Sequence, residues 1–409
     1  MIKFEYISND KYKFNEKEIS ADKLAELIKD GAIAEILVRC NEDGEKSFCI
    51  ENKLVALPDS QLVQNMQVIY FGVPGTGKSY SISQKIKEYY PDYDEKLNIN
   101  ENVFRTTIHS EYSYFDFVGN ILPVSKNNII DYRFVPGIFT LALYRAYTDN
   151  KPVFLVLEEM SRGNIAAIFG DLFQLLDRDH KGNSDYSINH QIICDYIKKT
   201  SEVENIQIRP SILNVLENGT IYLPHNLHIL GSINTSDQNV FVLDNAFKRR
   251  FQMKYISLKP IAKNGELLNN EEIKIGSHSI KWCDFFPVLN KFIVKNMGHN
   301  EDKQIGQFFL KFKDESMFNL ENYAETEKED IKKYIKEWNE SQVLDKLLLY
   351  LWQDIEKASF NNSKIFNREI VSFSDLSDLI EEYRSSETVT RNKEVFSEEF
   401  LEMLPKAGN

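Results

Sequence analysis

The segment Gly72-Val-Pro-Gly-Thr-Gly-Lys78-Ser79 decides the fold of this chain, because it matches the phosphate-binding pattern GxxxxGK(S/T). An apolar run precedes it at residues 68–71, and a stretch with helical spacing follows it at residues 79–90. Backbone N–H groups of a glycine-rich loop at a helix N-terminus can surround phosphate oxygens. In this pattern the lysine contacts the β- and γ-phosphates, and the Ser79 hydroxyl binds Mg²⁺. The predicted phosphate-binding residues are Gly72, Val73, Pro74, Gly75, Thr76, Gly77, Lys78 and Ser79.

Two adjacent carboxylates follow another apolar run. Residues 153–157 read Val-Phe-Leu-Val-Leu, and Glu158 and Glu159 come directly after them. A buried strand that ends in acidic residues beside a phosphate-binding loop is typical of nucleotide hydrolysis. We expect Glu158 to hold the Mg²⁺ shell and Glu159 to polarise the attacking water as a general base. Aspartate is usual at the first position, so the longer Glu158 side chain is a departure that affects the metal geometry.

Polar and basic residues end the next predicted elements. The apolar run at residues 227–233 leads into Asn234, a candidate for contact with the γ-phosphate or the attacking water. An Asx-type turn is the structural alternative, and Asp237 is a weaker candidate of the same kind. Further on, Arg249 and Arg250 end a short helical segment, where the helix dipole alone would favour cations. The functional interpretation is that one of them reaches a neighbouring subunit's nucleotide and stabilises charge on the transferring phosphoryl group.

Apolar strands alternate with helices along the middle of the chain, which predicts an α/β fold with a parallel sheet between helices. We divide the chain into a small α+β N-terminal module at residues 1–62, a nucleotide-binding core at 63–258, and a mostly helical C-terminal domain at 259–409. The expected core strands are residues 68–71, 103–108, 153–157 and 227–233, and the expected core helices are 79–90, 138–147 and 165–176. Further helices are expected at residues 282–295, 329–338, 343–358 and 373–383. In the N-terminal module we expect strands near residues 3–6, 36–39 and 48–50, and a helix at 21–27.

Composition excludes several classes of protein. The 409 residues include 49 basic and 62 acidic ones, a net charge of −13, so DNA contacts require a local basic patch or a partner. No run reaches the roughly 18 apolar residues of a membrane helix, so no membrane contact is expected. The first residues do not resemble a secretory signal, and the four cysteines lack zinc-site or disulfide-framework spacing. We therefore expect a cytoplasmic protein with reduced cysteines.

The order of phosphate loop, acidic strand, polar strand end and arginine-bearing helix resembles that of the AAA+ ATPase superfamily. Three segments resemble the McrB family more specifically: residues 107–119, residues 158–170, which contain Arg162-Gly163-Asn164, and residues 233–251. The resemblance covers roughly residues 65–258 and implies an AAA+ core followed by a helical lid domain. A hairpin at residues 121–124 and 130–135 would then face the centre of a ring. Lys126 would contact DNA or a peptide at its tip, unless the hairpin is merely solvated.

McrB is the nucleotide-driven motor subunit of a bacterial restriction complex that cuts modified DNA. The resemblance therefore implies a homo-oligomeric ring, expected to be a hexamer, with ATP or GTP and Mg²⁺ at each subunit interface. It also implies a separate McrC-like nuclease subunit, with DNA bound through the complex and not tightly by this chain. On this reading the catalytic residues are Glu159, Asn234 and either Arg249 or Arg250, the metal residues are Ser79 and Glu158, and Arg162-Gly163-Asn164 communicates between subunits. ATP is slightly favoured over GTP.

Two other functions remain open from the sequence. One is a regulatory scaffold that binds nucleotide, assembles as a ring and turns over slowly, and the other is a protein-remodelling chaperone of the MoxR type. The segment before the core, about 62 residues, is too short for the base-reading domain of full-length McrB. We therefore do not expect recognition of modified cytosine to transfer to this chain. The target, the role of residues 1–62 and the identity of the partner are not specified by the sequence.

Overall fold

The structure, a computed structural model, describes residues 65–98, 100–126, 129–236, 241, 243–318, 323–357, 363–385 and 394–405, and the backbone of five strands nearer the N-terminus. These strands form a three-stranded meander and a separate hairpin. The expected helix at residues 21–27 lies outside the described residues. The meander comprises β1 (Phe4–Ser8), β2 (Lys11–Phe14) and β3 (Lys17–Ser20), and the hairpin comprises β4 (Leu37–Cys40) and β5 (Lys46–Cys49).

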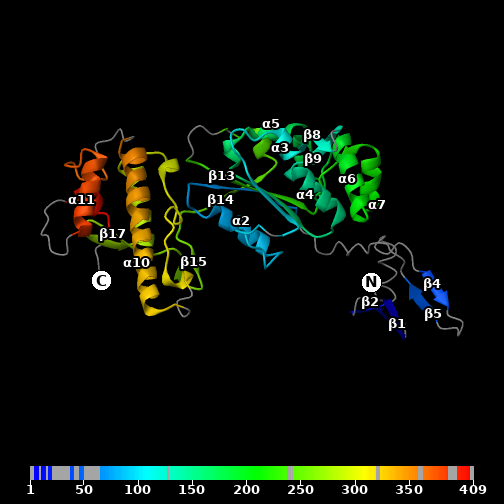
Figure 1. Cartoon of the computed structure of the whole chain (residues 1–409), viewed down its shortest axis with the longest axis horizontal. Coiled ribbons are helices and arrows are strands. Elements are labelled where there is room, and N and C mark those ends of the chain that lie inside the picture. The colour runs from blue at the N-terminus through cyan, green and yellow to red at the C-terminus, as the bar shows by residue number, and fades with distance from the viewer. Residues whose placement is uncertain are drawn as a thin grey trace.

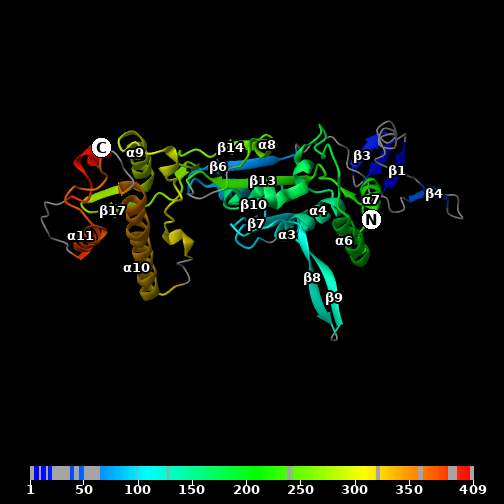
Figure 2. The same cartoon turned by 90° about the horizontal axis from the view of Figure 1, so that it is seen from above.

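The core is a five-stranded parallel sheet (Figure 1) with the order β14-β6-β13-β10-β7 (Figure 2). The predicted parallel α/β architecture is confirmed, and all four expected strands are present. The fifth strand, β14, was not expected, because all four of its residues are exposed at the sheet edge and give no apolar run. The strands are β6 (Gln67–Gly72), β7 (Val103–Thr107), β10 (Val153–Glu158), β13 (Leu227–Asn234) and β14 (Gln252–Tyr255).

Helices cover both faces of this sheet, because the interior strand β10 is apolar on both sides. Phe154 and Val156 pack with Ile82 and Ile86 of α2 (Lys78–Lys87). Leu155 and Leu157 belong to the larger core on the opposite face, which contains α4 (Ile138–Thr148). The remaining core helices are α3 (Tyr114–Phe117), α5 (Ile165–Phe169), α6 (Gln191–Glu204), α7 (Pro210–Glu217) and α8 (Asn245–Lys248).

The expected helix at residues 165–176 is divided in two. It begins as α5 and continues as the 3₁₀ segment Gly170–Leu176, because Gly170 has a φ of 52° that an α-helix cannot include. Two further pieces were not expected: the 3₁₀ turn Met160–Arg162 after β10, and the small sheet of β11 (Ile188–Asn189) and β12 (Thr220–Ile221).

A long hairpin, β8 (Gly119–Lys126) paired with β9 (Ile129–Pro136), projects from the core (Figure 2). It agrees with the hairpin expected from the sequence. Its outward-facing side chains are largely apolar, and Tyr132 is 70% exposed. The tip residues 127 and 128 and the side chain of Lys126 lie outside the described residues, so the expected tip contact stays a prediction.

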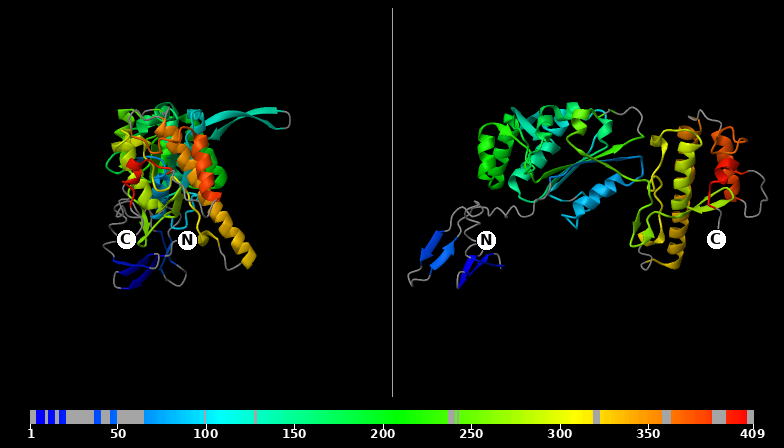
Figure 3. Two further views of the ribbon diagram at one scale, coloured as in Figure 1. Left: turned by 90° about the vertical axis from the view of Figure 1, so that its left-hand side faces the viewer. Right: turned by 180° about the vertical axis from the view of Figure 1, so that it is seen from behind.

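The C-terminal part of the chain has its own hydrophobic core and is mostly helical, as expected (Figure 3). Its short hairpins were not expected, since the strands are only two to four residues long. None of the helices in the described ranges is long and apolar enough to cross a membrane. The elements are β15 (Ala262–Lys263), β16 (Glu266–Leu267), β17 (Glu272–Ile275), β18 (His278–Lys281), α9 (Trp282–Lys295), α10 (Glu325–Ser341), the π-helical turns Gln342–Leu348 and Leu351–Glu356, α11 (Phe373–Ser385) and α12 (Glu398–Leu401).

Candidate functional site

The carboxyl ends of three neighbouring strands bring the predicted residues together. β6 leads into residues 72–79, β10 ends at Glu158, and β13 ends at Asn234. The parallel register pairs Asn234 with Gly72 and places Leu157 opposite Gly231. In open parallel sheets, ligands bind beyond the carboxyl ends of the strands. The candidate site therefore lies at this edge of the sheet, where the sequence predicted it.

The phosphate loop connects β6 to the N-terminus of α2. Gly75 and Gly77 have φ values of 77° and 88°, in the left-handed region that residues with a Cβ rarely adopt. Gly77 is the N-cap of α2, and no side chain caps this helix end. The first turn of α2 contains no acidic residue that would repel an anion. The backbone N–H groups at this end therefore suit phosphate oxygens.

The two polar side chains that open α2 are already oriented by the site. The ammonium group of Lys78 is buried and donates to the carbonyl oxygens of Gly72 and Val73 at 3.0 and 2.9 Å. The hydroxyl of Ser79 donates to Oε2 of Glu158 at 3.0 Å. A hydroxyl and a carboxylate in contact are hard oxygen ligands of the kind Mg²⁺ prefers. Ser79 and Glu158 therefore fit the metal role expected from the sequence.

Glu158 also has two partners that the sequence analysis missed. Ser232 of β13 donates to Oε2 at 2.5 Å, and Arg105 of β7 donates from Nη2 to Oε1. Burial is the largest influence on the pKa of the Arg105 guanidinium and lowers it, but the charge of Glu158 and the hydrogen bonds with Tyr93 and Glu158 together leave the pKa raised. The guanidinium therefore remains charged at any physiological pH. Neither residue belongs to a recognisable motif, but both lie on strands that flank β10.

Glu159 has a strained backbone. Its φ and ψ are 56° and 41°, a left-handed conformation that is uncommon for a residue with a side chain. Residues held in such conformations cluster at functional sites. The strain turns the chain sharply after β10, so that Glu158 and Glu159 point to different partners.

The carboxylate of Glu159 is held between two other predicted residues. The side-chain amide of Asn234 donates to both carboxylate oxygens at 2.8 and 2.7 Å. Nε of Arg162 donates to Oε2 at 3.2 Å. The side chain of Glu159 remains 28% exposed, so water can reach it. Asn164 has a local role, because its side chain caps α5 by accepting from the backbone N–H of Ala167.

The structure separates the two candidate arginines. Arg250 is 9% exposed, donates to Asp177 at 2.5 Å and to the carbonyl of Ala246, and stacks over the Phe173 ring at 4.1 Å. Arg249 is 66% exposed and lies 4.0 Å from Asp177. Both are on the far end of α8 from the Asp244 N-cap. Asp237, the weaker polar candidate, lies outside the described residues.

A segment of the C-terminal part contacts the phosphate loop through the backbone. The N–H groups of Gly306 and Phe308 donate to the carbonyl oxygens of Pro74 and Gly75 at 2.8 and 2.7 Å. A Cβ on Gly306 would lie 2.4 Å from backbone atoms of Gly75, so only glycine fits this approach. Because only carbonyl oxygens are used, the N–H groups of the loop remain available for phosphate. This contact was not predicted from the sequence.

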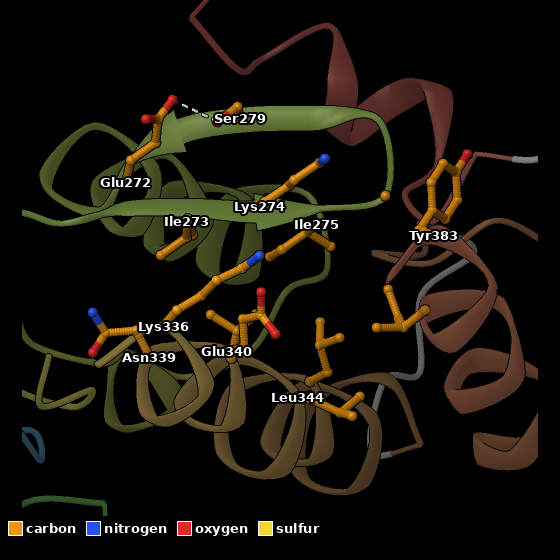
Figure 4. Close-up of a pocket in the computed structure, with 14 residues that line it drawn as sticks. Glu272, Ile273, Lys274, Ile275, Ser279, Lys336, Asn339, Glu340, Leu344 and Tyr383 are labelled. Carbon is orange, nitrogen blue, oxygen red and sulfur yellow. Dashed lines mark hydrogen bonds between the residues drawn. The ribbon is translucent and has the colours of Figure 1, made fainter. Parts of the chain in front are cut away.

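A cavity of about 450 Å³ lies elsewhere, between the β17–β18 hairpin and α10 (Figure 4). Its lining combines Lys274, Lys336 and Glu340 with the apolar side chains of Ile275 and Leu344. None of the residues predicted to bind nucleotide lines this cavity. The cavity is therefore separate from the predicted nucleotide site.

Sequence comparison finds known proteins that are similar to this chain over more than the residues of the candidate site. No family model matches the chain. The chain is 31% identical over 369 residues to the type II restriction enzyme BsuMI component YdiS of Bacillus subtilis, a match that covers 83% of this chain and 92% of that protein. It is 24% identical over 225 residues to the EcoKMcrB subunit of a type IV methyl-directed restriction enzyme of Escherichia coli, covering 53% of this chain and 42% of that protein. A solved structure of an ATPase candidate from Cytophaga hutchinsonii matches with 14% identity over 46% of this chain and 41% of that one, at a TM-score of 0.25, which is too low to support an argument.

Proposed function

Because the chain belongs to the McrB-like family of AAA+ NTPases, we propose that it is the nucleotide-hydrolysing subunit of a restriction complex, in which it forms a ring and a separate nuclease subunit docks on that ring. The observation that carries the proposal is the meeting of the phosphate loop, Glu158, Glu159 and Asn234 at one sheet edge. The relative that is 31% identical is itself a restriction-enzyme component. A hexameric ring, with one nucleotide at each subunit interface, is the assembly we propose.

In the proposed reaction, the phosphate loop binds ATP or GTP and Lys78 turns from the loop carbonyls to the β- and γ-phosphates. Ser79 and Glu158 would hold Mg²⁺, which would supply positive charge to the phosphate oxygens. Glu159 accepts the proton of the attacking water. Asn234 donates to both Glu159 oxygens in this structure, and the carboxylate keeps acceptor sites for water, because an ionised carboxylate has about four lone-pair sites and the side chain is 28% exposed. The amide of Asn234 thereby orients the carboxylate of the base.

We propose that Arg249, and not Arg250, completes the site of the neighbouring subunit. Arg249 is exposed, whereas the guanidinium of Arg250 is used within its own subunit by Asp177 and Phe173. A guanidinium that stabilises developing phosphoryl charge must be free to leave its own surface. DNA is then reached through the complex, since the net charge of −13 opposes tight binding by this chain alone.

The test of this function is hydrolysis by the purified chain, measured with ATP and with GTP, in the presence of Mg²⁺. We expect turnover to rise when the nuclease subunit is added. Slow turnover that does not respond to a bound nuclease subunit would support the regulatory scaffold instead. Processing of an unfolded protein substrate, without any nuclease partner, would support the remodelling chaperone.

We expect Lys78→Ala to lower hydrolysis by roughly 10²–10³-fold, the usual cost of losing one preorganised charge-stabilising donor. Nucleotide affinity should fall as well, because the lysine offsets charge in the ground state. Hydrolysis and fluorescent-nucleotide binding measure the two effects. Lys332→Ala, which removes an exposed lysine of α10 that lies 3.5 Å from Glu329, is the control. Hydrolysis by Lys78→Ala at the wild-type rate would show that the site is misassigned.

A further inference from the structure

Glu158 occupies a position at which the shorter aspartate is usual, and the structure contains an ion pair that can orient the longer side chain. Glutamate has one more methylene group and one more rotatable bond than aspartate, so its carboxylate can point in more directions. Mg²⁺ tolerates little deviation from octahedral geometry, so a carboxylate without a fixed orientation is a poor ligand. Something must therefore select the orientation of Glu158 that faces Ser79.

The two oxygens of Glu158 have different partners. Oε2 accepts from the hydroxyls of Ser79 and Ser232, on the side of the phosphate loop. Oε1 is taken by Arg105 alone among the contacts in the described ranges. The ion pair thus fixes Oε1 and leaves Oε2 directed at Ser79, in the first turn of α2.

Arg105 is itself held in place. Its Nη1 donates to the hydroxyls of Ser83 and Tyr93 at 3.1 and 3.3 Å, and Glu95 lies 4.0 Å away. The side chain is 14% exposed. A planar guanidinium with fixed donors can orient a carboxylate in a way that a flexible ammonium cannot. Arg105 reaches Glu158 from β7, the strand that pairs with β10 on the side opposite β13.

We propose that Arg105 is the positioning residue that allows a glutamate to serve at the metal end of β10. It binds Oε1 of Glu158, so that Oε2 faces Ser79 and the Mg²⁺ shell. The inference rests on the proposed nucleotide site and adds a residue that acts through Glu158, without contact to the nucleotide. It also makes Glu158 and Arg105 a matched pair: a shorter carboxylate at position 158 would not reach both the arginine and the Ser79 hydroxyl.

The test measures how nucleotide binding depends on Mg²⁺ in Arg105→Met, a change that keeps an unbranched, flexible side chain and removes the charged guanidinium. We expect the Mg²⁺ concentration for half-maximal tightening of binding to a non-hydrolysable nucleotide to rise by about 10–100-fold, the usual effect of losing a partner that orients a metal ligand. Binding of the same nucleotide without Mg²⁺ should be unchanged. Arg368→Met, at an exposed arginine of the C-terminal part, is the matched control.

A second comparison separates positioning from a general structural role. In a Glu158→Asp background, the effect of Arg105→Met on Mg²⁺ dependence should largely disappear, because the shorter carboxylate does not need the arginine. A structural role predicts the same effect in both backgrounds, together with weaker binding in the absence of Mg²⁺. Arg105→Lys should recover only part of the Mg²⁺ response, and it is the variant to use if Arg105→Met does not fold.

The outcomes distinguish this inference from the proposed function. If the wild-type chain shows no Mg²⁺-dependent nucleotide binding, the proposed function itself fails. If the wild-type chain does and a folded Arg105→Met matches it at every Mg²⁺ concentration, only the role of Arg105 is overturned. An equal effect of Arg105→Met in the wild-type and Glu158→Asp backgrounds would also overturn it.

Discussion

The Glu159→Gln variant is expected to bind nucleotide as tightly as the wild-type chain and to hydrolyse it roughly 10²–10⁴-fold more slowly, the range for loss of a general base. Glutamine preserves the size of the side chain and the capacity to accept from the Asn234 amide through its carbonyl oxygen. It cannot take a proton from water. Single-turnover hydrolysis and equilibrium nucleotide binding measure the two effects separately.

The same variant should also form a more stable oligomer in the presence of nucleotide. Nucleotide that is bound but not consumed remains at the interface, and a ligand that binds only the assembled state stabilises it by mass action. Glu202→Gln, at an exposed glutamate of α6, makes the same chemical change away from the site. Hydrolysis by Glu159→Gln that equals that of Glu202→Gln would remove Glu159 from the catalytic role.

Arg249→Ala is expected to lower hydrolysis by about 10³-fold, within the range for arginines that act in trans, and to leave nucleotide binding and stability nearly unchanged. The guanidinium is 66% exposed and its loss leaves no buried group unpaired. Thermal unfolding, nucleotide titration and hydrolysis together give the profile. Wild-type turnover in this variant would exclude Arg249 as the trans residue.

Arg250→Ala is the built-in comparison, because it lies next to Arg249 and has the same charge. Its removal leaves Asp177 without its 2.5 Å partner and uncovers the Phe173 ring. Losing a hydrogen bond to a charged group costs about 1.5–3 kcal/mol, so this variant should show a lower unfolding midpoint. Arg249→Ala should not. If Arg250→Ala instead lost hydrolysis without losing stability, and Arg249→Ala lost stability, the assignment of the two arginines would be reversed.

Much of the site could be predicted because each of its principal groups follows an apolar strand. The loop at residues 72–79, Glu158 and Asn234 each end a run that the sequence marks as buried, and strands of a parallel sheet end at the same edge. Proximity of these groups follows from that topology. The backbone strain at Glu159 could not be predicted, because glutamate has no preference for the left-handed conformation that it adopts here.

Other parts of the site depend on tertiary contacts that leave no pattern in the chain. Arg105 lies inside a strand, and its role is visible only once β7 is placed beside β10. Gly306 and Phe308 meet the phosphate loop from a distant part of the sequence through backbone atoms, which carry no side-chain signal. Arg249 and Arg250 are the same residue type, and they differ only in the exposure and contacts of their side chains, which the sequence does not show.

On our proposal, Arg249 of the next subunit completes each nucleotide site, and a mixing experiment with two variants tests this. Arg249→Ala, which retains Glu159, is mixed with Glu159→Gln, which retains Arg249, and hydrolysis is followed across mixing ratios. Each variant alone should be nearly inactive, and the mixture should regain part of the wild-type activity, with a maximum at intermediate ratios. Interfaces that combine Glu159 of one subunit with Arg249 of its neighbour account for that recovery. Mixed oligomers that form and yet recover no activity at any ratio would contradict the account.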